Sequence, residues 1–355
     1  MPSDVHLNGH IFSTTNAPST NMSKRQITSF FAPVASKKQR FDLTSKLPPS
    51  THPNYPHPIT CLPPALVFSS RQGADVNDGG SSSNTAATDE IAPLVFNGKP
   101  DLDMLHYQPF LHRSLAQELY TFLRRELPFY RVTYSIKRDG TDTVVNTPRY
   151  TSLFGVDAMC IFHPETGTLL DAEKKLPIKY AYPGCNPRPI PQCLLPLLEY
   201  TEARTNSSYN FLLINYYSNG ADSIAFHSDD ESFLGENPTI ASLTLGSTRD
   251  FVMKHKTEPS QKLSLPLASG DLVLMKGTTQ PRWLHSVPKR KHSGPRINIT
   301  FRFVKTRKGT ENYYRYNVGT GPVYRWDEAT GEMKVWERGK EEAVSEVDAS
   351  VKKET

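Results

Sequence analysis

The sequence predicts a mainly β protein, built as a sandwich or barrel of short strands with helices packed outside it. The first observation is that apolar, β-branched segments follow one another at short spacing after residue 208, with turn residues between them. The second is that two helical patterns, each ended or entered by a proline, come before these segments. The eight expected strands are 209–217, 222–228, 239–245, 249–254, 262–266, 271–275, 282–287 and 295–304.

Residues 1–95 are predicted to form a long disordered tail in front of the folded domain. Eleven of the 29 prolines lie here among Ser, Thr, Asn and Gly, and the apolar residues show no periodicity. Such a stretch buries too little apolar surface to offset the entropy lost on ordering the chain. The folded domain is therefore expected to span residues 96–305.

A short apolar segment interrupts this tail at residues 24–31. On one turn of helix, Ile27, Phe30 and Phe31 would form a single apolar plug for the pocket of a partner. The segment resembles the box by which proteins dock on the replication sliding clamp, although Lys24 holds the position where Gln is usual. The alternative is a chance apolar patch.

A basic cluster at residues 37–40 follows this box. Its sequence Lys-Lys-Gln-Arg is typical of a nuclear import signal or of weak nucleic-acid contacts, and the alternative is a solvated run of charges. The net charge of +5 permits a polyanionic partner without requiring one.

The composition argues against other classes of protein. The sequence has no run of 18 apolar residues and does not open with a basic segment followed by an apolar one, so neither a membrane span nor a secretory leader is expected. The four cysteines show no CxxC pair or metal-finger spacing, which indicates free thiols in a reducing compartment.

The folded domain is expected to open with a helix. Ser114 and Gln117 have the spacing of a capping box, and Pro128 would end the helix after Leu127. The predicted buried stripe is Leu115, Leu119, Phe122 and Leu123.

Residues 131–155 are predicted to hold β-rich runs joined by a hairpin turn at 137–140. The stretch is basic and partly aromatic, which would suit a phosphate backbone, and a solvated hairpin is the alternative. A proline-rich segment, 183–192, then leads into a second helix with Pro196 in its first turns.

A metal site is predicted around residues 227–229. His227 and Asp229 are two positions apart at the end of an expected strand, so both side chains point to the same face. His285, in a later strand, can supply a third ligand. Two histidines and one carboxylate form the ligand set of many non-haem Fe(II) oxygenases.

The expected strand at 295–304 alternates strictly between apolar and polar residues. Arg296, Asn298, Thr300 and Arg302 share one face. If that face points inward, the two arginines can bind the carboxylates of a small dicarboxylate that chelates the metal. The alternative is a half-exposed strand with a polar outer face.

These motifs occur in an order that resembles the AlkB family of iron(II)/2-oxoglutarate dioxygenases. The resemblance rests on HSDDE at 227–231, the later His285 and RINITFR at 296–302, and it covers about residues 100–305. Further similar segments are PRYTSLFG, LLINYYSNGADSI, ASLTLGSTRDFVMKHK and GDLVLMKGTTQPRWLHSVP. It is closest to the nuclear branch that repairs alkylated DNA and RNA, and it implies a double-stranded β-helix (jelly-roll) core.

The resemblance also implies roles for individual residues. The implied Fe(II) ligands are His227, Asp229 and His285. The implied 2-oxoglutarate pocket comprises Arg296 at the distal carboxylate, Arg302 near the iron-bound carboxylate, and Asn215, Tyr217 and Asn298. The implied substrate-binding residues are Asp230, Glu231, Arg149 and Arg249, the last of which can instead pair with Asp250. The nearest aromatic residues for stacking on a flipped base are Phe162 and His163.

The implied function is oxidative demethylation of N-alkylated bases, of the 1-methyladenine and 3-methylcytosine type, in DNA and also in RNA. Fe(II), 2-oxoglutarate and O₂ would be used, formaldehyde would be released, and DNA alkylation damage would be repaired. The hairpin tip lacks the large apolar residue by which duplex-acting relatives enter DNA, with Val144 and Val145 nearest, so a single-stranded or flipped-out base is favoured.

Three alternatives remain at this point: an RNA demethylase, an oxygenase that acts on another substrate, and a catalytically silent adaptor that binds the sliding clamp. The protein is expected to be a nuclear monomer without membrane contact.

The chain after residue 305, where the resemblance to the AlkB family ends, is predicted to consist of two parts. Residues 306–336 are basic and aromatic, so they either run along a nucleic-acid backbone or cover the barrel as an ordinary amphipathic extension. Residues 337–355 have mixed charge and are predicted to be a disordered tail.

Overall fold

The computed structural model describes residues 47–63, 66, 92–179, 182, 184–314 and 321–337, all within the unit Lys46–Thr355. The clamp-like box at 24–31, the basic cluster at 37–40 and the stretch 338–355 lie outside the described residues.

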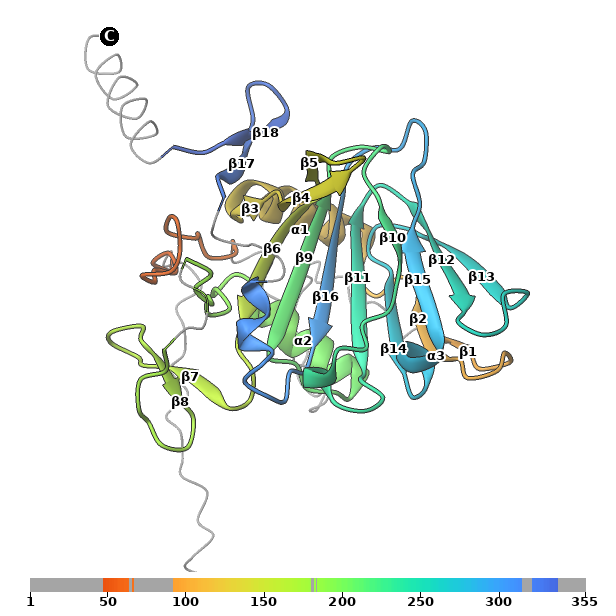
Figure 1. The fold of residues 1–355 in the computed structure, drawn as a ribbon, viewed down its shortest axis with the longest axis horizontal. Helices are drawn as coiled ribbons and strands as arrows, with labels where there is room; N and C mark the ends of the chain where they lie inside the picture. Colours follow the sequence, from red (N-terminus) through yellow and green to blue (C-terminus); the bar gives the residue numbers. More distant parts are fainter. Residues whose placement is uncertain are drawn as a thin grey trace, which may run out of the picture. The chain divides into compact units, whose positions relative to one another are not determined.

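Two antiparallel sheets face each other in the domain (Figure 1). The large sheet consists of β1 (Leu94–Phe96), β2 (Asp103–Tyr107), β3 (Phe129–Tyr130), β6 (Tyr150–Gly155), β9 (Phe211–Tyr217), β11 (Ile240–Gly246), β14 (Leu272–Lys276), β16 (Arg296–Arg302), β17 (Val323–Asp327) and β18 (Glu332–Val335). The small sheet consists of β10 (Ile224–His227), β12 (Arg249–His255), β13 (Lys262–Leu267) and β15 (Trp283–Val287). Their orders are β1–β2–β14–β11–β16–β9–β6–β3–β17–β18 and β10–β15–β12–β13.

Shorter elements complete the described fold. Two separate hairpins pair β4 (Thr133–Arg138) with β5 (Thr141–Asn146) and β7 (Cys160–Phe162) with β8 (Leu169–Asp171). The helices are α1 (Arg113–Glu126), α2 (Leu195–Thr205), α3 (Thr279–Arg282), η2 (Ser232–Leu234) and η3 (Thr310–Tyr314). The eight strands expected after residue 208 are all present, with ends that differ by one or two residues.

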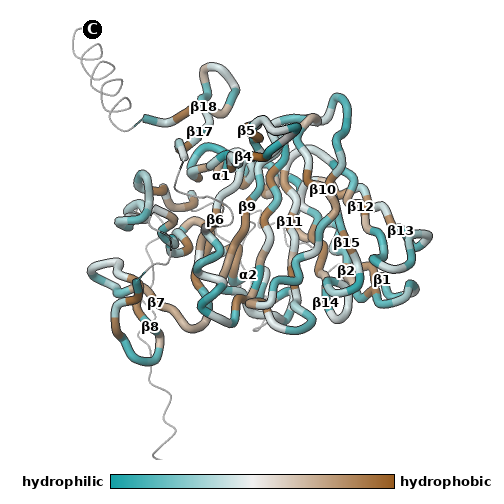
Figure 2. Tube along the Cα trace, viewed as in Figure 1, coloured by the Kyte–Doolittle hydropathy of each residue, from teal (hydrophilic) through white to brown (hydrophobic). Residues whose placement is uncertain are grey.

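The central strands of the large sheet, β6, β9, β11, β14 and β16, are buried on both faces. Its helix-side residues, such as Ile297 and Leu212, form one apolar core with α1 and α2, which lie along that face (Figure 1). Its other face packs with Phe251, Met253 and Trp283 of the small sheet in a second core. Apolar residues accordingly follow the large-sheet strands, and hydrophilic residues gather at the strand ends (Figure 2). This two-layer arrangement confirms the predicted jelly-roll core with outer helices.

Helix α1 confirms the expected helix but begins differently. Its N-cap is His112, whose side chain accepts a hydrogen bond from the Ser114 N–H, so the prediction that Ser114 caps the helix is wrong. The imidazole takes the capping role because its ring nitrogen reaches the same free N–H groups as a hydroxyl would. Leu119, Phe122 and Leu123 are buried as expected, whereas Leu115 is half-buried and Ala116 faces the core.

The predicted hairpin turn is present between β4 and β5. Asp139 and Gly140 have φ values of 49° and 79°, the left-handed pair that a two-residue type I′ turn requires. This hairpin belongs to neither large nor small sheet, so it projects as a separate ribbon whose base is fixed by bonds such as Arg131 Nε to Thr147 O, 3.2 Å.

The prediction that the tail extends to residue 95 is wrong for residues 47–63. Ile59 is 0% exposed, Tyr55 is also buried, and both belong to the helix-side core. Polar contacts fasten the segment further: Tyr55 donates to Pro189 O at 2.7 Å, and Asn54 donates to Pro187 O at 2.7 Å. Composition misled the prediction because prolines fix an irregular backbone, while a few apolar side chains are enough to anchor it.

The C-terminal extension covers the edge of the large sheet. Strand β17 pairs with β3 and β18 pairs with β17, while the Arg124 guanidinium of α1 lies 3.6 Å from the centre of the Trp326 ring. Tyr313, in η3, is fully buried. Of the two alternatives for residues 306–336, the described part supports the amphipathic cover.

Two compositional expectations can also be compared with the structure. The four cysteines are free and buried. Among the described residues, no helix is long and apolar enough to cross a membrane.

The packing of residues 47–63 can be tested by Ile59→Ala. Removing a fully buried Ile side chain leaves a cavity, so the free energy of unfolding should fall by about 2–5 kcal/mol in a denaturant titration. The exposed neighbour provides the control, because Thr60→Ala should change it by less than about 0.5 kcal/mol. Equal effects from the two substitutions would contradict this packing.

Candidate active site

A cavity of about 520 Å³ lies between the two sheets. Residues of β9 and β16 line one wall, residues of β10, β12 and β15 line the other, and the β4–β5 hairpin contributes Tyr134 at the rim. Most of the predicted site residues meet here: Arg149, Asn215, Tyr217, His227, Asp229, Glu231, His285, Arg296, Asn298 and Arg302.

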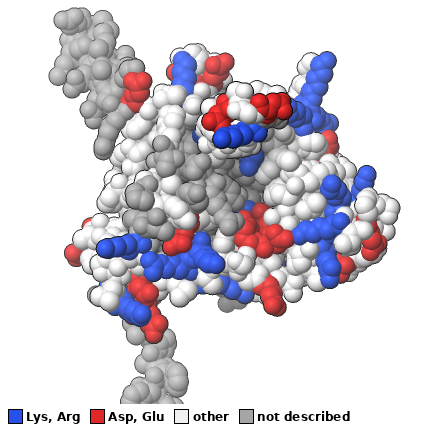
Figure 3. Space-filling model, viewed as in Figure 1, with Lys and Arg blue, Asp and Glu red and all other residues white. Residues whose placement is uncertain are grey.

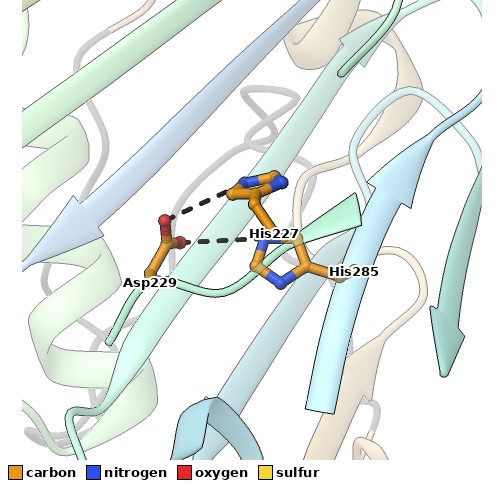
Figure 4. Close-up of side chains that lie close together, drawn as sticks. All are labelled: His227, Asp229 and His285. Carbon is orange, nitrogen blue, oxygen red and sulfur yellow. Dashed lines mark ion pairs between the residues drawn. The ribbon is translucent and has the colours of Figure 1, made fainter. Parts of the chain in front are cut away.

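Three side chains that could hold a metal ion, His227, Asp229 and His285, converge in this cavity (Figure 4). His227 and His285 lie opposite each other on β10 and β15, and Asp229 follows two residues after His227. Their ligand atoms all lie within 4.8 Å of one another. The Asp229 carboxylate oxygens are 4.0 Å from His227 Nε2 and 3.8 Å from His285 Nε2.

Neighbouring groups orient these side chains. His227 Nδ1 lies 2.9 Å from Ala225 O, and a carbonyl can only accept, so Nδ1 carries the proton and Nε2 keeps its lone pair for a metal. The Asp229 N–H donates to Gln280 Oε1 at 2.9 Å. Arg302 Nη2 donates to Asp229 Oδ1 at 2.6 Å.

The protonation states of this cluster fit a divalent cation. Burial lowers the pKa of His285 to about 3, with a further lowering by His227, so its imidazole is neutral at physiological pH. Burial alone would raise the pKa of Asp229, but Arg302 and the two histidines outweigh it and hold the pKa below its usual value. A neutral imidazole and an ionised carboxylate are what Fe(II) coordination needs.

Arg296 lies in the same cavity as a buried cation without a carboxylate partner among the described residues. It is 1% exposed, donates Nη2 to Thr244 Oγ1 at 2.8 Å, and has its guanidinium 5.3 Å from the centre of the Tyr217 ring. Its Nε and Nη1 groups have no hydrogen-bond partner in the described part of the chain. Burial lowers its pKa to about 10, so it stays charged and needs an anion.

The remaining polar residues of the pocket are placed by strand register. Asn215 lies opposite Asn298, and Tyr217 lies opposite Arg296, so the four side chains share one face of the paired strands β9 and β16. Asn298 donates to Ser242 Oγ at 2.8 Å, and Arg149 donates to Asn215 Oδ1 at 3.2 Å. The alternative that β16 has a polar outer face is wrong, because every residue of this strand is buried.

The two acids after the metal carboxylate point in different directions. Glu231 lines the cavity, where its Oε1 lies 3.6 Å from Arg302 Nη1. Burial raises the pKa of Glu231, against the opposing effect of Arg302. Asp230 is exposed and pairs with Lys256 at 2.6 Å.

Three other expected substrate residues lie elsewhere. Arg249 is 1% exposed and donates to the carbonyls of Asp222 and Pro288, so it joins two loops and does not match a position at the substrate. Phe162 and His163 line a separate groove beside the segment 51–58, away from the metal cluster.

Several residues of the site were not expected from the sequence. Tyr134 is 47% exposed on β4 and lines the cavity rim. The sequence had pointed to Phe162 and His163 as the aromatic residues that stack on the base. The alternation of Tyr134 with Ile136 in the hairpin was the available signal, because both lie on the face that carries Val145. Thr244 and Gln280 act as partners of Arg296 and Asp229, and no local motif marks either of them.

The fold and the site define a jelly-roll oxygenase with a 2-His-1-carboxylate centre. The family model of the 2OG-Fe(II) oxygenase superfamily matches residues 103–302. The chain belongs to this superfamily, whose metal and cosubstrate are Fe(II) and 2-oxoglutarate.

Similarity to curated proteins indicates which branch of this superfamily the chain resembles. The chain is 36% identical over 205 residues to the alpha-ketoglutarate-dependent dioxygenase alkB homolog 3 of Bos taurus, a match that covers 55% of this chain and 64% of that protein. It is 41% identical over 140 residues to the Homo sapiens homolog 3, covering 37% and 49%. It is 38% identical over 135 residues to the DNA oxidative demethylase ALKBH2 of Homo sapiens, covering 35% and 52%. The chain thus spans about half to two thirds of the length of these relatives, which support an AlkB-like oxygenase of the nuclear repair branch.

The metal centre can be tested by His227→Ala. Loss of one of three ligands should lower Fe(II) affinity by more than about 100-fold in anaerobic titrations, beyond the effect of losing an outer partner. Asp230→Asn is the matched control, since that carboxylate faces Lys256, and it should bind Fe(II) like the parent protein. Retained affinity in His227→Ala would rule out this ligand set.

The anion site can be tested by Arg296→Met. Removing one partner of a buried charge pair should weaken 2-oxoglutarate binding by at least about 30-fold in calorimetry on the metal-loaded protein. Arg290→Met removes the same charge from an exposed position and should leave the affinity unchanged. Similar affinities for the two variants would show that the dicarboxylate binds elsewhere.

Proposed function

We propose that the protein removes N-linked methyl groups from alkylated bases of DNA and RNA, as an Fe(II)/2-oxoglutarate-dependent oxygenase. One observation carries the proposal: a three-ligand cluster, a buried arginine without an anionic partner among the described residues, and the half-buried Glu231 carboxylate share one cavity. These three parts match a metal, an acidic cosubstrate and a cationic substrate.

On this proposal, His227, Asp229 and His285 hold Fe(II), and Arg296 binds the distal carboxylate of 2-oxoglutarate. Arg302 lies on the side of the metal-bound carboxylate, and Asn215, Tyr217 and Asn298 complete the pocket. The oxidation of an N-methyl carbon, followed by release of formaldehyde, is the chemistry that the bound iron and 2-oxoglutarate supply. The chain itself positions the base and excludes water from a cavity enclosed by two sheets.

Glu231 gives the proposal its substrate class. A base such as 1-methyladenine or 3-methylcytosine carries a positive charge, which a carboxylate in a low-dielectric cavity attracts strongly. The charge disappears when the methyl group is lost, so the product is held less tightly than the substrate. Asp230 is already paired with Lys256 and does not line the cavity.

The base must leave its stack to enter this cavity, because the cluster lies between the two sheets. Tyr134 is the aromatic residue at the rim that can stack on the base, and Arg149 is the cation within reach of its phosphate. Tyr134 shares one face of the hairpin with Ile136 and Val145, and Tyr134 is the member of this group that lines the cavity.

The demethylation itself can be tested with Fe(II), 2-oxoglutarate, ascorbate and oligonucleotides that carry 1-methyladenine as single strand, duplex or RNA. The parent protein should remove the methyl group and release formaldehyde, while His227→Ala should be inactive. Glu231→Gln should lower kcat/KM by about ten-fold, or about 1.4 kcal/mol of transition-state stabilisation. The exposed Glu236→Gln should leave it unchanged.

The outcomes of this assay separate the alternatives. Activity on RNA alone would favour the RNA demethylase, and turnover of 2-oxoglutarate without loss of methyl groups would indicate another substrate. Fe(II) binding without any turnover would favour the adaptor.

Recruitment to the replication sliding clamp, nuclear localisation and a monomeric state are further parts of the proposal. The support is sequence alone: Ile27, Phe30 and Phe31 in the box at 24–31, and the basic cluster at 37–40. A peptide of residues 20–40 should bind the clamp in calorimetry, and Phe30→Ala with Phe31→Ala should abolish binding, because the two rings form most of the plug. A parent peptide that does not bind would remove the recruitment claim.

A further inference from the structure

The small sheet has an irregular strand directly beside the metal cluster. Ile224 lies opposite Val287 and His227 opposite His285, so β10 carries one residue more than β15 over this interval. Such a bulge turns a side chain out of the regular alternation, and bulges are common next to active sites. Phe226, the residue before His227, lies within this irregular interval and is 41% exposed.

The exposed ring lies on the outer face of the small sheet. His285 and Met253 are paired in register and buried toward the cavity, so Lys254, next along β12, points to the opposite face. Lys254 Nζ lies 4.2 Å from the centre of the Phe226 ring. Phe226 therefore shares the outer face with Lys254.

This surface carries further positive charge. Lys262 lies opposite Lys254 on β13 and is exposed, and Lys256 follows two residues after Lys254 along the chain. Lysine and arginine side chains gather over β12 and β13 beside a group of acidic side chains (Figure 3). One acid near the mouth, Asp230, is already paired with Lys256.

We propose that Phe226 and Lys254 bind the nucleotide next to the target base. The ring stacks on that neighbouring base, and the lysine ammonium pairs with its phosphate. This subsite rests on the proposed function and extends it, since it names the part of the substrate that lies outside the cavity. The occupant is a single strand, because a base that stacks on a protein ring has left its own helix.

The position of Phe226 and the positive charge beside it both favour a single-stranded nucleic acid as the occupant. Phe226 lines the cavity that would receive the target base and is also 41% exposed, so the two subsites adjoin at this residue. An exposed aromatic ring beside a cation is the pairing by which single-stranded nucleic acid is bound, with stacking for the base and charge for the backbone. A purely apolar partner would leave Lys254 and Lys262 without counter-charges.

The subsite can be tested by binding, separately from catalysis. Fluorescence anisotropy would measure the affinity of the full-length, metal-loaded protein for a labelled, unmodified fifteen-nucleotide oligo-dT and for a duplex of the same length. Phe226→Ala should weaken single-strand binding by about ten-fold, and Phe226→Trp should restore it. Lys254→Ala should reduce the slope of the logarithm of the affinity against the logarithm of the salt concentration by about one, the value for one phosphate contact. Duplex affinity should change far less in the Phe226 variants.

Two controls isolate the effect. Lys174→Ala removes the same charge from the exposed β8 turn and should change single-strand affinity by less than about two-fold. Fe(II) affinity of Phe226→Ala should equal that of the parent, which shows that the neighbouring His227 is undisturbed.

Each result decides the inference. Equal single-strand affinities for the parent, Phe226→Ala and Lys254→Ala would overturn it, as would a parent protein that binds no oligonucleotide. The demethylation assay on the same preparations judges the proposed function independently, because the subsite can bind an unmodified strand whether or not methyl groups are removed.

Discussion

The buried ion pair between Arg302 and Asp229 is the contact on which the site depends. Arg302 Nη2 lies 2.6 Å from Asp229 Oδ1, and their side chains are only 2% and 6% exposed. Neither charge would be stable alone there, because an unpaired buried charge costs several kcal/mol. The pair joins the segment after β10 to the end of β16, which places the carboxylate beside the two imidazoles. The His227–Asp229–His285 cluster and the polar face of β16 therefore share one charged contact.

Side chains of strand β16 alternate between two faces, so one set packs in the apolar core and the other lines the cavity. Ile297, Ile299 and Phe301 pack against the helices, and the alternating polar residues face the cavity. The polar face is acceptable in the interior because β11 supplies hydroxyl partners: Thr244 accepts from Arg296, and Ser242 accepts from Asn298. Both bonds run diagonally, since Thr244 lies opposite Asn298 and Ser242 lies opposite Thr300. Arg296 still keeps two donor nitrogens, Nε and Nη1, for a ligand, since neither has a hydrogen-bond partner among the described residues.

How far the sequence predicts this structure depends on whether a feature is local. The HxD spacing, the strict alternation of residues 296–302 and the strand and helix periodicities are local, and they predicted a sandwich or barrel with outer helices, the three metal-ligand candidates and the two arginines. The jelly-roll core and the roles of Asn215, Tyr217 and Glu231 were implied by the resemblance to the AlkB family. Features that arise from distant contacts were missed. Residues 47–63 pack through Ile59 although their composition resembles a disordered tail, and His112 caps α1 through a ring nitrogen. Arg249 looks like a pocket residue in sequence, but the loop carbonyls of Asp222 and Pro288 hold it away.

The charges of the cavity determine which ligands it can bind together. Arg149, Arg296 and Arg302 face Asp229 and Glu231, and the His285 imidazole is neutral. Fe(II) brings two positive charges and 2-oxoglutarate brings two negative charges, so their joint binding leaves the net charge of the cavity unchanged. Either of them alone would leave an uncompensated charge in a low-dielectric space, so each should favour the other. Glu231 Oε2 then remains a buried acceptor without a hydrogen-bond partner among the described residues, and on the proposed function it is the acceptor that the cationic base meets.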